Sequence, residues 1–178
     1  MYDTGFAPCT KDGFLTLGCC KPVIRRSAKK GDYIVAFYSK ACKYSHKLAY
    51  IAKVTDVMDF STYYEKHQDR TDCIYNDKLR QLENDFHNSS HRKRDLSGQN
   101  VLLSDNFIFF GDEDMEMAEK YMGMLAGRGH KVKCNDKHRK TFPKYFEELK
   151  KEYGEGKIGN HIHERLQPRK RKRKAVEM

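Results

Sequence analysis

The stretch "LTLGCCKPVIRRSAKKGDYIVAFYSK", residues 15–40, decides the fold. Residues 32–39 within it are rich in aromatic and β-branched side chains, so they predict a strand. Residues 13–20 alternate weakly between apolar and polar and predict a second strand, which ends at the Lys21-Pro22 pair. A dense cationic linker, residues 21–30, therefore joins two short strands.

This linker has two interpretations. Runs of charge are usually solvated, so the first is a connector whose Val23 and Ile24 pack on the sheet edge. The second is a rim that grips phosphate, because the guanidinium groups of Arg25 and Arg26 match phosphate in a bidentate way and lysines add point charge. The sequence leaves both open.

The rest of the chain adds strands with short links and helices around them. A short polar link after residue 39 predicts an antiparallel hairpin with the next strand. We expect an α+β domain, a small curled β-barrel with peripheral helices. The expected strands are 47–60 and 100–111, broken at 104–106, and the expected helices are 60–67, capped by Ser61 or Thr62, 113–126 and 141–154.

The length of 178 residues suits one domain with its own core. We assign residues 1–153 to it, with 77–99 as a mobile insertion because that segment is polar and lacks a period. Residues 154–178 are expected to be a disordered basic tail. The sequence has no apolar run of about 18 residues and no visible secretory leader, so we expect no membrane partner.

Charge points to a polyanionic partner. The net charge is +10, and the body remains basic without the tail. The tail suits the acidic grooves of nuclear import receptors and the phosphates of DNA or RNA equally well, so we expect a nuclear protein; a merely solubilising tail is the alternative. The expected nuclear localisation signal is Arg169, Lys170, Arg171, Lys172, Arg173 and Lys174.

The thiols and histidines show no spacing that indicates metal binding or catalysis. The six cysteines are expected to be reduced, and CxxC spacing is missing, so we expect no metal and no cofactor. Cys19 or Cys20 with His46 or His130 is a conceivable nucleophile and base, but no spacing supports the pair. We therefore favour a binding module over an enzyme.

Aromatic side chains on the strands are the second candidate feature. Each is more often a core residue, yet a concave sheet with one or two aromatics stacks a nucleobase at roughly 1–3 kcal/mol. The glycine-rich stretch 127–131 is either a helix cap and turn or a flexible loop that brings Arg128 and His130 to a ligand. The strand aromatics are Phe37, Tyr38, Tyr50, Phe107, Phe109 and Phe110.

Several motifs in a fixed order resemble a known family. These are "DTGFAP", "TLGCCKPVIRRSAKKGDYIVAFYSK", "LAYIAKVTDVMDFSTYY", "IYN", "VLLSDNFIFFG" and "GRGHK". Together, over about residues 3–131, they resemble the nucleotide modification associated domain, type two. More remotely, the order of strand, basic linker and strand is similar to the PUA-like superfamily of EVE, YTH and ASCH domains. Those are small curled β-barrels with peripheral helices, and several cradle a modified or flipped base.

This resemblance implies a base-binding pocket here. The chain begins almost at the family's first motif, so we expect the barrel to lack the strand that usually precedes it, and Cys73 stands where relatives tend to have asparagine. By the resemblance, the pocket would be lined by Asp3, Thr4, Gly5, Phe6, Cys20, Lys21, Arg25, Arg26, Asp32, Tyr75, Ser104 and His130.

The expected function is recognition, without chemistry, of a modified or extruded base in DNA or RNA. One alternative is a nucleotide- or base-processing enzyme that uses Asp3, Cys20 or His130. Another is a chromatin-associated interaction protein, held near nucleic acid only by its basic body and tail.

Overall fold

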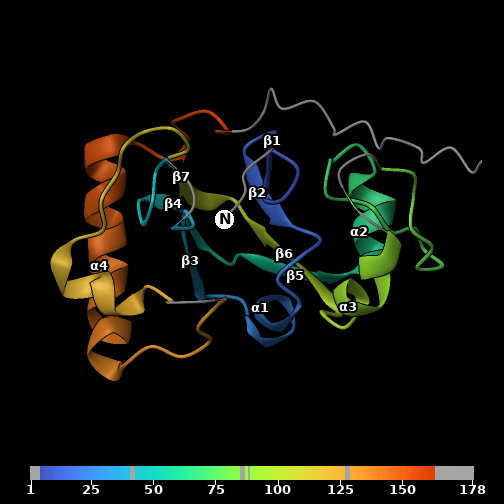
Figure 1. Ribbon diagram of the computed structural model, residues 1–178, viewed down its shortest axis with the longest axis horizontal. Helices are drawn as coiled ribbons and strands as arrows, with labels where there is room; N and C mark the ends of the chain where they lie inside the picture. The colour runs from blue at the N-terminus through green and yellow to red at the C-terminus, as the bar shows by residue number, and fades with distance from the viewer. Residues whose placement is uncertain (1–4, 41–42, 85–86, 88, 127–128, 163–178) are drawn as a thin grey trace, which may run out of the picture.

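The computed structural model describes residues 5–40, 43–84, 87, 89–126 and 129–162. They form an α+β fold with two four-stranded sheets, ordered β1-β2-β6-β5 and β3-β4-β7-β8 (Figure 1). The strands are β1 Cys9–Lys11, β2 Phe14–Leu17, β3 Tyr33–Phe37, β4 Leu48–Lys53, β5 Asp56–Asp59, β6 Asn100–Ser104, β7 Asn106–Phe109 and β8 Gly156–Lys157. The helices are α1 Pro22–Ser27, α2 Phe60–His67, α3 Arg92–Leu96 and α4 Asp136–Tyr153, with 3₁₀ turns η1 Ser89–His91 and η2 Glu119–Met124.

A bent antiparallel ribbon connects the two sheets. β4 runs into β5 and β6 runs into β7, so that β5 pairs with β6 in one sheet and β4 with β7 in the other. At the corner the Ser104 hydroxyl donates to the Lys53 carbonyl at 2.7 Å, and the Asp105 N–H donates to the Thr55 hydroxyl at 3.2 Å. The predicted break at 104–106 is confirmed, whereas the single strand predicted over 47–60 is wrong because the chain turns this corner after Lys53.

The expected curled β-barrel does not close among the described residues. A barrel needs hydrogen bonds between its first and last strands, but β1 and β5 end one sheet while β3 and β8 end the other. The predicted hairpin of β3 with β4 is confirmed. The coarser prediction, a mixed α+β domain with peripheral helices, therefore holds, and the likeness to the PUA-like superfamily stays a prediction.

The core has three layers, which the strand period of two produces. β7 directs Phe107 and Phe109 into a cluster between the sheets, and Ile108 towards α4. A third cluster lies between the first sheet and α2, and Figure 1 shows α4 at one end of the molecule with α2 and α3 at the other. Of the aromatics considered for stacking, Phe107, Phe109 and Phe110 are core residues with at most 2% of their surface exposed.

The helices partly follow the sequence prediction. α2 spans the predicted residues, but its cap is Asp59, whose carboxylate accepts from the Thr62 N–H at 2.8 Å. α4 buries Phe142, Phe146 and Leu149 as its period predicts. The helix predicted over 113–126 is wrong, because the carbonyl of Met115 accepts from the N–H of Leu48 at 2.8 Å instead of bonding within a helix. Only the short η2 turn forms there.

Two segments expected to be irregular contribute to the body. Within the predicted tail, β8 pairs in parallel with β7, and His161 is buried with its ring 4.4 Å from that of Phe109. Within the predicted insertion 77–99, α3 brings the buried Asp95 against α1. The mobility of the insertion stays a prediction, and residues 163–178 lie outside the described residues. No helix in the described part of the chain has the length and apolar character needed to cross a bilayer.

The cap of α2 provides a stability test. We expect Asp59→Ala to lower the free energy of unfolding by about 0.5–2 kcal/mol, because it leaves an N-terminal N–H without its acceptor. Ser61→Ala, at the half-buried position that the sequence suggested as the cap, removes only a surface hydrogen bond to the Asp77 carbonyl and should cost less. The hydrogen bond from Thr62 lowers the pKa of Asp59. The Asp59 contribution should thus be present above the ordinary Asp pKa of about 3.9 and disappear as pH falls through the lowered value; urea unfolding across this range measures it.

Candidate functional site

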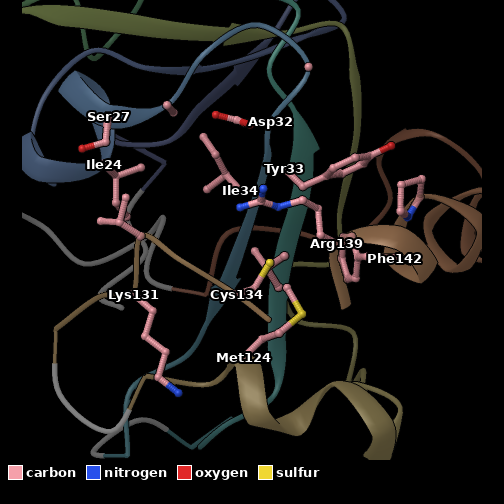
Figure 2. A pocket seen from close by; sticks show the side chains of 15 residues that line it. Ile24, Ser27, Asp32, Tyr33, Ile34, Met124, Lys131, Cys134, Arg139 and Phe142 are labelled. Atoms are coloured by element: carbon pink, nitrogen blue, oxygen red, sulfur yellow. The ribbon is translucent and has the colours of Figure 1, made fainter. Parts of the chain in front are cut away.

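A groove follows the edge of β3 that pairs with no other strand among the described residues. It consists of two adjoining cavities of about 470 and 440 Å³, which we call the first and second cavity of the β3 groove. The first lies between β3, α1 and the start of α4 (Figure 2), and the second continues along β3 towards Tyr38. Both volumes fall in the range of about 300–1,000 Å³ typical of small-ligand sites. The cavities share Ile24, Ile34, Val35, Met124 and Lys131.

Cationic side chains surround this groove. The second cavity has no carboxylate among its described lining residues. The first has Asp32, whose carboxylate already accepts from the Lys29 N–H at 2.8 Å, and Figure 2 shows Arg139 reaching into it from α4. The groove is therefore electropositive and suited to an anion. The second cavity's cationic or titratable lining residues are Lys21, Lys40, His46, His130 and Lys131.

The walls of the second cavity combine aromatic and backbone surface. Phe37, Tyr38 and Tyr50 line it. Tyr38 and Tyr50 are largely buried, whereas Phe37 is half-buried. β3 ends its sheet, so the antiparallel ladder directs alternate N–H and C=O groups of this strand away from β4. A planar, hydrogen-bonding ligand with a negative charge matches such a surface.

Arg25 forms a buried polar hub behind the groove. Its guanidinium is fully buried and donates to the carbonyls of Cys20 at 2.7 Å, Asn100 at 2.7 Å and Asp95 at 2.6 Å. It also lies 5.3 Å from the ring centroid of Phe60. Gly98 leaves room for it, since a Cβ there would lie 2.6 Å from the Arg25 Cζ. Arg25 thus joins α1, α3 and β6.

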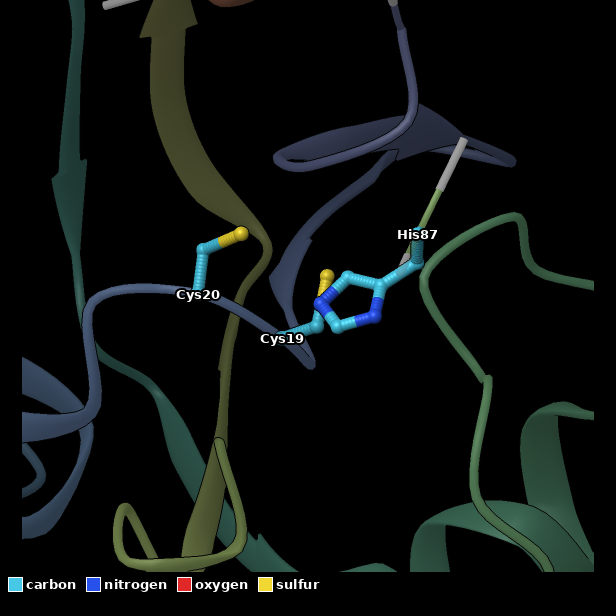
Figure 3. Close-up of side chains that lie close together, drawn as sticks. All are labelled: Cys19, Cys20 and His87. Atoms are coloured by element: carbon cyan, nitrogen blue, oxygen red, sulfur yellow. The ribbon is translucent and has the colours of Figure 1, made fainter. Parts of the chain in front are cut away.

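Asp95 organises a thiol–imidazole cluster beside this hub. Its carboxylate accepts from the Cys20 N–H at 3.1 Å and the Tyr75 hydroxyl at 3.3 Å, and lies 2.5 Å from the His87 Nε2. One ligand atom each from Cys19, Cys20 and His87 lies within 4.8 Å of the others (Figure 3). Cys19 and His87 are buried, and Cys20 is exposed.

The two thiols differ in their ionisation. A hydrogen bond from the Cys19 thiol lowers the pKa of Cys20, and the positive charges of Arg25 and Lys21 act in the same direction. That hydrogen bond, together with burial, raises the pKa of Cys19. Burial, with the Asp95 charge, also raises the pKa of Tyr75. Cys20 is therefore the thiol of the pair that ionises first.

The chain reaches this cluster through a strained turn that Asp72 anchors. Cys20 and Lys21 have φ values of 58° and 42°, in the left-handed region that side chains rarely adopt. Just before them, the Gly18 N–H donates to the buried Asp72 carboxylate at 2.6 Å. A Cβ at Gly18 would lie 2.6 Å from the Asp72 carbonyl oxygen. Such strain persists only where surrounding contacts hold it, and it occurs often at functional sites.

The predicted pocket residues divide into separate groups. Lys21 and His130 line the second cavity and Asp32 the first. Cys20, Arg25 and Tyr75 meet at Asp95, and the ring of Phe6 lies 6.0 Å from that of His87. The structure does not bring the whole set into one pocket.

The remaining predicted residues lie elsewhere. Gly5 is beside His161, since a Cβ there would lie 3.2 Å from the His161 ring, and Ser104 holds the corner of the bent ribbon. Arg26 is exposed on α1, where binding to phosphate stays a prediction. The Arg25 guanidinium is buried and donates to three carbonyls, an arrangement that disfavours the predicted contact with phosphate. Asp3, Thr4, Arg128 and the basic run Arg169, Lys170, Arg171, Lys172, Arg173 and Lys174 lie outside the described residues.

Sequence reasoning missed His87, Asp95 and Arg139. His87 and Asp95 lie in the polar segment without a period, where nothing marks a buried residue. Arg139 lies in the first turn of α4, three residues before Phe142, so the two side chains share a helix face and both line the first cavity.

A family comparison agrees with the motif order. The family described as nucleotide modification associated domain 2 matches residues 1–71 and 67–164. No curated protein and no solved structure matches the chain.

The two neighbouring arginines of α1 allow a matched test of the buried hub. We expect Arg25→Lys to lower the free energy of unfolding by about 3–5 kcal/mol, because lysine leaves buried carbonyls without their donors. Arg26→Lys on the same helix should change it by less than about 0.5 kcal/mol, as exposed substitutions usually do. Urea unfolding followed by circular dichroism measures both. Equal effects would contradict the structural role of Arg25.

Proposed function

Because the chain belongs to the nucleotide modification associated domain 2 family, we propose that it binds a modified or extruded base of DNA or RNA in the β3 groove. The family supports a role in nucleic acid modification, and the groove suggests how the chain takes part. One observation carries the proposal: the second cavity combines aromatic walls with cationic lining residues and has no carboxylate among its described lining residues. Recognition, rather than catalysis, is what this combination provides.

Phosphates would bind at the rim of the groove. Lys21 lies at the start of α1 and Lys131 between the two cavities, so the two lysines flank the second cavity. Arg139 adds a guanidinium at the far end. These contacts would supply affinity that depends on salt but not on base identity.

The base would enter the second cavity. Extruding a base costs a few kcal/mol, least when it is damaged or in a single strand. Stacking on an aromatic side chain returns roughly 1–3 kcal/mol. Phe37 is the half-buried aromatic of this cavity, and the outer edge of β3, which pairs with no other described strand, offers donors and acceptors to the edge of the base. Together these contacts offset the cost of extrusion.

Nuclear localisation is a further part of the proposal. The basic run at 169–174 would bind an import receptor and would add nonspecific affinity for nucleic acid. Any binding test therefore has to distinguish the affinity that the tail contributes from the affinity of the groove.

Fluorescence anisotropy with single- and double-stranded DNA and RNA, each with and without modified bases, tests the groove. We expect a preference for one modified base. Phe37→Leu should weaken binding of that base by roughly 1–3 kcal/mol while the salt dependence stays the same. Lys21→Gln and Lys131→Gln should each weaken binding to all bases equally and reduce the salt slope by about 1.

Two controls identify the source of affinity. Lys144 lies on the outer face of α4 with 86% of its side chain exposed, so Lys144→Gln should leave binding unchanged. A chain with residues 169–174 replaced by glutamine should retain the base preference. Affinity that ignores base identity and disappears with the tail charges would refute the groove proposal, leaving an interaction protein held by charge alone.

A further inference from the structure

We propose that Cys19, Cys20 and His87 form a binding site for a thiophilic metal ion of the Zn²⁺ class, distinct from the base-binding role of the groove. Two thiolates and an imidazole are ligands that Zn²⁺ prefers, whereas Mg²⁺ and Ca²⁺ prefer oxygen. One ligand atom from each residue lies within 4.8 Å of the other two. Figure 3 shows the thiol of Cys19 next to the His87 ring and that of Cys20 on the adjacent residue.

The state of His87 is a second, independent observation. Only 4% of its side chain is exposed, yet its Nδ1 has no hydrogen-bond partner among the described residues. The Nε2 lies 2.5 Å from an Asp95 carboxylate oxygen, in ion-pair contact. A buried polar atom without a partner costs free energy. A metal ion at this ring would satisfy it.

The surroundings supply the outer partners that metal ligands require. Metal-bound histidines usually have a carboxylate close by, which orients the ring. Asp95 lies beside the His87 ring and also accepts from the Cys20 N–H, so it contacts two of the three ligand residues. Arg25 in turn holds the Asp95 backbone through its carbonyl. The cluster is therefore held by the hub that the domain needs for folding.

The coordination would be incomplete on the protein side. No fourth histidine, cysteine or carboxylate joins the cluster among the described residues. Zinc sites with three protein ligands keep a fourth position for water or substrate, unlike closed structural sites with four. Cys20 is exposed, so that open position would face solvent next to Lys21 at the groove. An oxygen of a bound phosphate or base is a ligand of the right chemistry for it.

Local sequence does not reveal such a site. Adjacent cysteines lack the usual ligand spacing, and His87 lies far along the chain in a segment without a pattern. Cys20 has a left-handed backbone conformation, and both thiols lie close enough to serve one site. The expectation that no residues bind a metal followed from the spacing of cysteines and histidines in the sequence. The fold brings His87 close to the two cysteines, which that spacing does not show.

Cobalt substitution tests the proposal on the full-length chain. The protein, reduced and stripped of metal with a chelator, is titrated with Co²⁺ and then with Zn²⁺. We expect one equivalent of Co²⁺ to produce visible bands typical of tetrahedral thiolate coordination, and Zn²⁺ to displace it. Cys20→Ser and His87→Gln should weaken Zn²⁺ binding by more than the roughly 10–100-fold expected for Asp95→Asn, a change outside the coordination shell.

Cys134→Ser is the matched control, because Cys134 is an exposed thiol outside the cluster. It should leave the spectrum and the affinity unchanged. Cys20 is exposed, so its replacement leaves the fold intact, which circular dichroism in excess chelator verifies for every variant. The proposal is overturned if the reduced chain gives no thiolate–Co²⁺ bands, or if Cys20→Ser and His87→Gln bind Zn²⁺ like the unaltered protein. Mass spectrometry before titration confirms that no Cys19–Cys20 disulfide blocks the ligands.

Discussion

The buried guanidinium of Arg25 is the interaction on which the rest of the structure depends. A charge removed from water is tolerated only when its hydrogen-bonding groups are satisfied. Arg25 meets this requirement with three backbone carbonyls from the Cys20 turn, α3 and β6, and with the ring of Phe60 below it. Two segments about 70 residues apart in sequence, residues 20–25 and residues 95–100, must therefore come together before the charge can be buried. Both candidate sites use residues of the segments that Arg25 holds together.

Much of the fold could be predicted from alternation and helical period. The alternation of apolar side chains predicts β3 and β7, and the helical period predicts the buried face of α4. The corner after Lys53 could not be predicted, because the apolar alternation continues through it and the bend is held by hydrogen bonds to Ser104 and Asp105, far along the chain. Nor could η2, since the backbone of Met115 bonds to β4 rather than along a helix.

Only those residues of the candidate sites whose exposure does not depend on tertiary contacts could be predicted from the sequence. Lys21 and His130 line the second cavity of the groove, and their contact with a base or phosphate stays a prediction. Arg25 and Arg26, adjacent and identical in type, have opposite environments, because helix α1 turns one side chain inward and leaves the other in water. The sequence of a charged run alone does not show which arginine is buried and which is exposed. Asp95 and His87 are hidden for the same reason: a polar residue becomes a buried partner only through a tertiary contact.

The turn at Cys20 and Lys21 links the two sites physically. Consecutive left-handed residues cost conformational energy that nearby contacts must offset, and the hydrogen bonds from Cys20 to Asp95 and from Arg25 to the Cys20 carbonyl provide such contacts. A ligand held by the Cys20 thiol would restrain this turn further. Lys21 is the next residue and lines the second cavity, so its ammonium would be positioned by the same restraint. Binding at the thiol–imidazole cluster and binding in the β3 groove would then stabilise the same backbone conformation, and each would favour the other.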